Sequence, residues 1–429
     1  MAFWHLFAAF FNLRLVLVTI LSFIVAYIFI VKFRRPSNIP PGPWCFPLLG
    51  YLPNIAVYSR FYGLPLPAVL LQLSKKYGCV FSLYLGDQLC VVLNSQEAVK
   101  EAFMNPKLND RPTATHFQND EATGIVNASG PNWKAQRAFT LGVFRRFGVG
   151  KAVFETQICS ELEILFKHFE DQNGASFDPS SLILNTISNI TSLDTVAHRY
   201  EYGDKEFKNL LHVEDRIVKL AGTAGFKNIV KILRLLPSKA NEILAKTKNE
   251  FMAIVNGNIM RRKNKFDSGT IECLIDVYLK KLYEKENLSE YINDESVGRT
   301  VASLFMAGTD TSSYQILWVL VYLLRHPKIF KKVQDEIDDT VGRDRLPTMD
   351  DQCDLPFTQA VINECMRLCA TVPMGVMHAA AEDATLLDIP YQRERCSWLI
   401  YGVFIMIQIR GHIQISLIRV GFWTTMDIW

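Results

Sequence analysis

One long stretch in the C-terminal half, residues 294–326, constrains the fold more than any other part of the chain. It has the length and composition of a single helix that is apolar almost all the way round, and such a helix is buried in a large core or in a membrane. Its middle turn, A-G-T-D-T-S-S at 307–313, is polar and interrupts any run of the roughly 18 apolar residues that a membrane span needs. Glycine, threonine and aspartate weaken a helix interior, so their presence here indicates a functional use for this turn.

The composition is that of a protein with a large core. The chain has 429 residues, of which 49% are hydrophobic, enough for one large domain or two ordinary ones. A net charge of +3 without any block of lysine and arginine does not favour nucleic-acid binding. The nine cysteines include no C-x-x-C pair, so we expect reduced thiols rather than a disulfide framework.

The N-terminus carries a membrane signal. Residues 15–31 contain no charge, and Lys32, Arg34 and Arg35 follow at once. Positive residues flank membrane helices on the cytoplasmic side, so we expect residues 1–35 to anchor the chain and the rest to face the cytosol. A buried core helix is the alternative. The proline-rich residues 36–53 predict a stiff, extended spacer, although an ordinary linker has a similar composition.

The body of the chain is predicted to be mostly α-helical with a small β part near its front. Residues 80–85 and 88–93 alternate between apolar and polar around Gly86-Asp87, which is typical of a β-hairpin. Helical patterns occupy residues 67–76, 95–105, 155–172, 184–195, 206–221, 239–265 and 271–284, and they continue to residue 369.

Three small groups of residues could carry chemistry, and each is weak alone. Trp133 and Arg137 lie at i and i+4 on one helix face, where the arginine could hold a buried carboxylate; a surface helix is the plainer interpretation. Glu364 and Arg367 lie at i and i+3 among apolar residues and should form a partly buried ion pair, although E-x-x-R is common by chance. His378 stands alone, and a lone histidine is more often a structural hydrogen bonder than a ligand.

Together and in this order, the apolar N-terminus, P-P-G-P, W-x-x-x-R, A-G-T-D-T-S and E-x-x-R resemble the microsomal cytochrome P450 heme-thiolate monooxygenases. Further stretches resemble the family 2-like members: F-D-P at 177–179, R-Y-E-Y at 199–202, V-Q-D-E-I-D at 333–338 and P-F-T-Q-A-V-I-N-E at 356–364. The resemblance implies a cytochrome P450 fold over residues 54–389 behind the anchor and the hinge at 36–53.

The same resemblance implies a function. The cofactor would be heme b, and one oxygen atom from O₂ would enter apolar substrates such as fatty acids, steroids or xenobiotics. NADPH-cytochrome P450 reductase would supply electrons at the endoplasmic reticulum membrane. The substrate pocket would be walled by residues 113–126 and 306–311, with parts of 217–229 and 372–376.

The resemblance also implies roles for single residues. Ala307 and Gly308 would open a groove over the heme, Thr311 would hydrogen-bond dioxygen, and Asp310 would help to relay protons. One heme propionate would be held by Trp133 and Arg137 and the other by His378, through charge-assisted hydrogen bonds. The ion pair of Glu364 and Arg367 would be structural.

The iron ligand of that family is missing from this sequence. The ligand cysteine should lie in F-x-x-G-x-R-x-C-x-G beyond the E-x-x-R helix, and these 429 residues contain no such motif. Cys396 lacks the glycines that shape the ligand loop, so no metal-binding residue is predicted.

The similarity ends near residue 389. We expect residues 390–429 to be an unrelated tail with strand-like alternation at 405–417, and the fold to lack its heme-ligand loop and last helix. This form is therefore expected to be inactive. Two alternatives are a non-catalytic anchored variant that binds the reductase or intact relatives, and an unstable splice or gene-model product.

Overall fold

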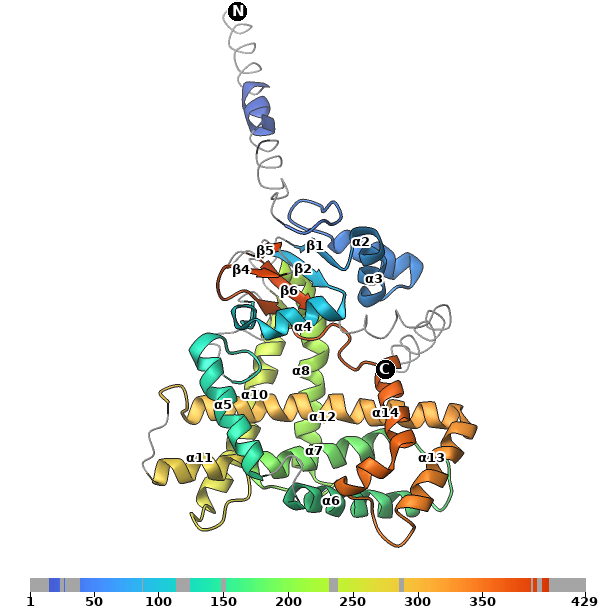
Figure 1. Cartoon of the computed structure of the whole chain (residues 1–429). Helices are drawn as coiled ribbons and strands as arrows, with labels where there is room; N and C mark the ends of the chain where they lie inside the picture. Colours follow the sequence, from blue (N-terminus) through green and yellow to red (C-terminus); the bar gives the residue numbers. More distant parts are fainter. Residues whose placement is uncertain are drawn as a thin grey trace, which may run out of the picture.

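The longest helix, α12 (Asp294–Arg325), lies across the middle of the molecule (Figure 1). The computed structural model describes residues 15–23, 27, 39–86, 88–112, 124–147, 152–230, 238–284, 289–386, 389–391 and 396–400. Helix α12 begins in a capping box: Ser296 N donates to Asn293 Oδ1 and Asn293 N donates to Ser296 Oγ, both at 2.9 Å. It ends just before His326, because a residue that precedes proline disfavours the helical conformation. The single helix predicted at 294–326 is confirmed.

Most of the described chain is helical, which confirms the predicted class. Helices α3, α4, α6, α10 and α11 correspond to predicted segments, whereas α7 and α8 are longer than predicted and α2 is not predicted at all. The helices besides α12 are α2 (Leu52–Tyr62), α3 (Leu66–Tyr77), α4 (Gln96–Met104), α5 (Gly130–Phe147), α6 (Ala152–Glu170), α7 (Ser180–Val196), α8 (Lys205–Ile229), α10 (Lys239–Asn264), α11 (Leu274–Tyr283), α13 (Pro327–Thr340) and α14 (Pro356–Leu368).

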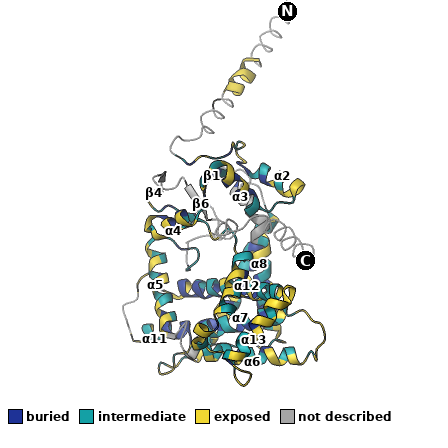
Figure 2. Cartoon of the chain, turned by 45° about the vertical axis from the view of Figure 1, so that its right-hand side comes forward, coloured by how far each residue is buried: buried dark blue, intermediate teal, exposed yellow. Residues whose placement is uncertain are grey.

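The main core contains buried residues of α7, α8, α10, α11 and α12, and α12 packs against α7 and α10. The contact with α7 is the most extensive, and small residues make it close. A Cβ atom added at Gly308 would lie 3.2 Å from Thr191 Oγ1 of α7, so glycine lets the two helices approach. The first half of α12 is buried as predicted (Figure 2).

The prediction that α12 is buried on every face is wrong for its second half. Tyr314 is 49% exposed and Leu324 is 72% exposed. Their side chains lie beyond the turns of α12 that α7, α8 and α10 cover. The described residues therefore leave an apolar face of α12 in contact with solvent.

A small sheet lies at one end of the bundle (Figure 1). The predicted hairpin is confirmed: β1 (Val80–Leu85) pairs antiparallel with β2 (Gln88–Leu93), Val80 opposite Leu93. Strand β6 (Cys396–Ile400) pairs parallel with β2 and antiparallel with β3 (His378–Ala379). Strands β4 (Ala384–Leu386) and β5 (Ile389–Tyr391) form a separate pair. The boundary predicted at residue 389 therefore runs through β5, and β6 joins the main sheet; residues 405–417 lie outside the described residues.

The proline-rich segment is not a free spacer in its described part, residues 39–53. Ser82 of β1 donates from its backbone N to Pro41 O and from Oγ to Pro40 O, both at 2.8 Å. Tyr51 N donates to Tyr84 O at 2.6 Å. Prolines lack a donor but keep their carbonyl oxygens, and β1 uses these as acceptors. The prediction of an extended spacer is wrong for these residues.

The N-terminal segment is described only at residues 15–23 and 27, which are helical; the remainder of the predicted anchor at 1–35 lies outside the described residues. Among the residues that are described, none of the helices combines the length and the apolarity that crossing a bilayer requires.

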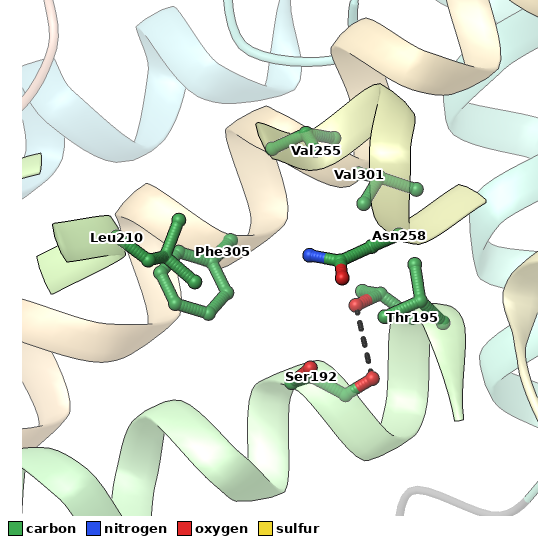
Figure 3. Close-up of a pocket in the computed structure, with 8 residues that line it drawn as sticks. Ser192, Thr195, Leu210, Val255, Asn258, Val301 and Phe305 are labelled. Atoms are coloured by element: carbon green, nitrogen blue, oxygen red, sulfur yellow. Dashed lines mark hydrogen bonds between the residues drawn. The ribbon is translucent and has the colours of Figure 1, made fainter. Parts of the chain in front are cut away.

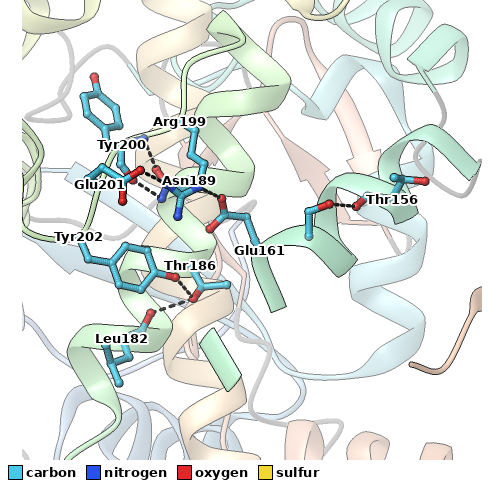
Figure 4. A network of polar contacts seen from close by, with 10 residues as sticks. Thr156, Glu161, Leu182, Thr186, Asn189, Arg199, Tyr200, Glu201 and Tyr202 are labelled. Atoms are coloured by element: carbon cyan, nitrogen blue, oxygen red, sulfur yellow. Dashed lines mark hydrogen bonds and ion pairs between the residues drawn. The ribbon is translucent and has the colours of Figure 1, made fainter. Parts of the chain in front are cut away.

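The R-Y-E-Y stretch that follows α7 joins three helices (Figure 4). Arg199 Nε donates to Glu161 Oε1 of α6 at 2.5 Å. Asn189 of α7 binds both backbone groups of Tyr200 at 2.9 Å, and Asn258 Nδ2 of α10 donates to Tyr200 Oη at 2.6 Å. This stretch therefore acts as a structural connection between α6, α7 and α10.

Replacing Arg199 alone should strongly destabilise the fold. Glu161 is only 1% exposed, so Arg199→Met leaves a buried carboxylate unpaired and should cost about 3 kcal/mol in the free energy of unfolding. The double variant Glu161→Leu/Arg199→Met removes both charges and should recover most of that loss. Urea unfolding of the three proteins gives the comparison, and equal losses in the single and double variants would contradict the assignment.

The close contact of α7 and α12 makes a second prediction. Gly308→Val should lower the free energy of unfolding by about 2 kcal/mol, because the added methyl groups meet Thr191. Gly257→Val in α10 is the matched control, since a Cβ there meets nothing within 4 Å. Urea unfolding should show the control within a few tenths of a kcal/mol of the wild type. Similar losses at both glycines would argue against tight packing at Gly308.

Candidate functional site

The residues of the polar turn of α12 face three different surroundings: α7, α8 and an open side. Thr309 is fully buried, and Gly308 faces Thr191 of α7. Ala307 is exposed and Thr311 partly so, and both lie on the open face, because Thr311 Oγ1 donates to Ala307 O at 2.6 Å. Threonine in helices commonly donates to the carbonyl one turn back, and its hydroxyl can give up this bond for another acceptor.

Gly308 lies in a different place from the one that the sequence suggested. The expectation was a glycine that opens a groove beside Ala307. Its missing Cβ instead points at Thr191, so the glycine serves the contact of α7 and α12. Two residues in a row on a helix point about 100° apart, and only Ala307 shares the face of Thr311.

Asp310 lies on the side of α12 that faces α8. Burial raises the pKa of its carboxyl above the ordinary value, and Asp215 of α8 raises it further, while Lys219 lowers it. A raised pKa favours the protonated form of this carboxyl, which makes it a better proton donor than an ordinary aspartate carboxylate. Asp310 and Thr311 are therefore neighbours in the sequence but face different surroundings.

A second group of residues lies where the start of α5 meets β3. Asp110 joins the two, because its Oδ1 accepts from Gly130 N at 2.9 Å and its backbone O accepts from Ala379 N at 2.7 Å. Arg111 follows, and its Nε donates to Val126 O at 2.8 Å. Asp110 thus holds both the start of α5, which carries Trp133, and β3, which carries His378.

Arg111 and His378 have the properties of an anion-binding pair. Burial lowers the pKa of the Arg111 guanidinium. Its side chain donates to the backbone carbonyls of Val126 and Met377, and no carboxylate binds it among the described residues. His378 donates to Leu108 O, and its Nδ1 is buried without a partner in the described part of the chain. A half-buried cation beside a buried imidazole nitrogen without a partner fits a ligand carboxylate.

The electrostatics of His378 agree with this description. Burial and the charge of Arg111 lower the pKa of His378 to about 4, so the imidazole is neutral at pH 7. A neutral imidazole that donates from Nε2 offers only an acceptor at Nδ1. A carboxylate placed there would favour the second proton and raise this pKa. The sequence did not single out Arg111, because a lone arginine before a proline matches no pattern.

The two remaining pairs differ in how well they match expectation. Arg137 lies over the Trp133 ring at 5.5 Å, as predicted for i and i+4 on one face. Arg367 donates to both oxygens of Glu364, at 2.6 Å and 2.5 Å. The Arg367 side chain is 25% exposed and the Glu364 side chain 54%, so the predicted partial burial holds for Arg367 and is wrong for Glu364. The reason is that the described residues cover only one side of α14.

A small cavity lies inside the bundle between α7, α8, α10 and α12 (Figure 3). Its volume of about 10 Å³ is that of a single water molecule, so it is no site for an organic ligand. The predicted substrate wall at 113–126 lies mostly outside the described residues. Within the described residues, acidic, histidine and cysteine side chains form no cluster that could hold a metal ion. The eight cysteines that precede β6 form no disulfide bond with one another.

Comparison with known proteins gives one consistent result. The family model described as "Cytochrome P450" matches residues 40–392. Cytochrome P450 18a1 of Drosophila melanogaster is 30% identical over 89% of this chain and 71% of its own length. Human cytochrome P450 2J2 is 32% identical over 87% of this chain and 74% of its own length. Rabbit (Oryctolagus cuniculus) cytochrome P450 2G1 is 31% identical over 82% of this chain and 71% of its own length.

The low pKa of His378 makes stability depend on pH. The folded state keeps His378 neutral down to about pH 4, whereas the unfolded chain binds a proton near pH 6.5. Stability should therefore fall as the pH drops from about 6.5 to about 4. Arg111→Gln removes the neighbouring charge, so the His378 pKa should rise in this variant.

Nuclear magnetic resonance of the full chain with labelled histidines measures the His378 pKa directly. Arg343→Gln, a change at an arginine with an 82% exposed side chain, is the control and should leave His378 unchanged. Titration of His378 near pH 6.5 in the wild type would show that the imidazole is not in the buried position described.

Proposed function

Because the chain belongs to the cytochrome P450 family of heme-dependent monooxygenases, we propose that it holds heme between Arg111–His378 and the open face of α12. We further propose that its substrates are apolar small molecules: fatty acids, steroids or xenobiotics. The observation that carries the heme site is the half-buried Arg111 beside the buried, unpartnered Nδ1 of His378. Heme has two carboxylates, and the described residues offer a place for one of them here.

The residues near that site would bind and orient the cofactor. Arg111 and an imidazolium of His378 donate to one carboxylate, and Trp133 with Arg137 holds the other. Ala307 leaves the surface of α12 flat beside Thr311, so a planar group can approach the helix. Glu364 and Arg367 fix α14 on the far side of α12 through their two hydrogen bonds.

Proton delivery is the role proposed for Thr311 and Asp310. Heme, when bound, supplies the iron centre at which dioxygen is activated. The Thr311 hydroxyl donates to Ala307 O in this structure, and a rotation about its χ1 would turn the proton outward. Asp310 is the adjacent proton source, since burial and Asp215 raise its pKa.

The iron ligand sets a limit on activity. These 429 residues lack F-x-x-G-x-R-x-C-x-G, so we propose that this chain as it stands provides no thiolate and does not turn over substrate. The chain would remain a membrane-bound protein of the endoplasmic reticulum, anchored by residues 1–35 and facing NADPH-cytochrome P450 reductase.

A non-catalytic role is the second candidate. Exposed apolar side chains on α12 and α14 offer surface for another protein: Tyr314, Ile316, Leu324, Ile362 and Met366. The chain would then bind the reductase or intact relatives without oxidising anything. Co-precipitation from membranes tests this role. A precipitate that contains neither the reductase nor an intact relative would refute it.

Spectroscopy separates heme binding from thiolate ligation. In membranes, the reduced, carbon-monoxide-treated chain should show no thiolate-type Soret band. A thiolate-type band at full heme occupancy would refute the proposed inactivity.

Hemin binding tests the carboxylate site. Arg111→Met and His378→Phe should each weaken hemin binding about tenfold or more, as expected for the loss of a charge-assisted hydrogen bond. Quenching of tryptophan fluorescence measures the affinity, with Arg343→Met as the control. Equal hemin affinity in all four proteins would exclude Arg111 and His378 from the site.

A further inference from the structure

A buried hydrogen bond joins α5 to α12. Thr300 of α12 donates from Oγ1 to Gln136 Oε1 of α5 at 2.9 Å. Gln136 is 1% exposed and Thr300 is 3% exposed, so the bond is shielded from water. The proposed function gives neither residue a role. Gln136 nevertheless stands in the sequence between Trp133 and Arg137, the pair that is proposed to hold a heme carboxylate.

The Thr300 hydroxyl differs from three other hydroxyls of α12 in its acceptor. Ser303, Thr311 and Ser313 each donate to the carbonyl one turn back in their own helix. That local bond is the usual one for serine and threonine inside a helix. Thr300 instead donates to the side chain of a different helix. Its hydroxyl therefore joins two elements rather than serving α12 alone.

The amide of Gln136 is held through both its nitrogen and its oxygen. Its Nε2 donates to Asn132 Oδ1, one turn earlier in α5. Its Oε1 accepts the proton of Thr300. Because an amide donates only from nitrogen and accepts only at oxygen, these two bonds together allow one orientation. Asn132 directly precedes Trp133, so this chain of bonds ends beside the proposed carboxylate pair.

Thr300 lies on the same stripe of α12 as the open face. At 3.6 residues per turn, Ala307 and Thr311 lie within about 20° of Thr300 around the helix axis, and Ala307 lies about 10 Å further along it. Helix α5 runs from the end of the molecule that carries the sheet to α12 and meets the stripe at Thr300 (Figure 1). Beyond this contact the stripe is exposed at Ala307 and partly exposed at Thr311.

Trp133 and Arg137 belong to the part of α5 that this bond fixes. Trp133 lies three residues before Gln136 and Arg137 directly follows it, and the Arg137 guanidinium lies over the Trp133 ring at 5.5 Å. Residues within one turn of a helix keep their relative positions because the same backbone hydrogen bonds join them. A shift of α5 at Gln136 would therefore move both residues relative to the open face of α12.

We propose that Gln136 and Thr300 are positioning residues for the cofactor. Their bond sets the place of α5 on α12 and so holds Trp133 and Arg137 where they can bind a carboxylate of a planar group on the open face. Both residues are buried and touch no ligand, so they act through Trp133 and Arg137. This role rests on the proposed function, whereas the contact between the two helices does not.

Two substitutions of Thr300 separate its hydroxyl from its shape. Thr300→Val keeps the shape and removes the donor, so it should weaken hemin binding about fivefold or more, whereas Thr300→Ser keeps the donor and should bind within about twofold of the wild type. Ser313→Ala is the matched control, since it removes an equally buried hydroxyl that bonds within α12. Absorbance titration of the full chain in lipid nanodiscs measures the affinity. Equal hemin affinity in Thr300→Val and the wild type overturns the proposal.

A double-mutant cycle distinguishes positioning from a general loss of structure. Residues that act through one another show losses that do not add. In the background Trp133→Phe/Arg137→Met, Thr300→Val should therefore weaken hemin binding by no more than about twofold further. A full fivefold loss in that background would mean that Thr300 acts by another route, and it would overturn the proposal. Gln136→Met removes the acceptor of the same bond and replaces Thr300→Val in these tests if that variant fails to fold.

Fluorine nuclear magnetic resonance detects the positioning without any ligand. In the full chain labelled with fluorotryptophan, the Trp133 resonance is the one that Trp133→Phe removes. It should shift in Thr300→Val and keep its wild-type position in Thr300→Ser and Ser313→Ala. An unshifted resonance in Thr300→Val, with hemin binding intact in the wild type, refutes the positioning alone. A wild type that binds no hemin refutes the heme site and with it the role for a cofactor.

Discussion

The close contact between α7 and α12 is the constraint on which the remaining geometry depends. Gly308 and Thr191 allow the two helices to approach, and this fixes the rotation of α12 about its own axis. With Gly308 turned toward α7, the residues before and after it must face elsewhere. Asp310 then faces α8 and Thr311 faces the open side, so one polar turn serves three different surroundings.

Charge is distributed unevenly around α12. On the side of α8, Glu214, Asp215 and Asp310 gather acidic groups with Lys219 as the nearby cation. At the junction of α5 and β3, the half-buried Arg111 and His378 have no bound carboxylate among the described residues. In the first group, burial raises the pKa of Glu214 and of Asp310 and so favours their neutral forms, whereas Asp215 is paired with Lys219. The second group is balanced best by a ligand that brings its own negative charge.

Strong periodic signals made the fold class predictable. The long helix, the hairpin and most other helices lie in sequence segments whose hydrophobic periodicity and intrinsic conformational preference predict the same structure. Helix α2 and the packing of residues 39–53 could not be predicted, because the acceptors of Pro40 and Pro41 are used by a strand about 40 residues away. The burial of Glu364 was overestimated, since apolar neighbours in sequence do not guarantee a covering element in space.

The site was only partly predictable for a related reason. Ala307, Asp310 and Thr311 lie in one recognisable turn, but the direction of each side chain depends on the packing of α7 and α8. Arg111 and Gln136 have no local signature. Arg111 gains meaning only beside His378, 267 positions further along the chain, and Gln136 only beside Thr300, 164 positions further along.

Cofactor binding and folding should be coupled in this chain. A ligand that binds only the folded state stabilises it more the higher its affinity. A carboxylate at Arg111 and His378 would also give the buried His378 Nδ1 a hydrogen-bond partner. The absence of the ligand motif from these residues removes one contribution to that affinity, the bond from a thiolate to iron. The carboxylate contacts do not depend on that bond. Heme held by its carboxylates would therefore stabilise the folded chain.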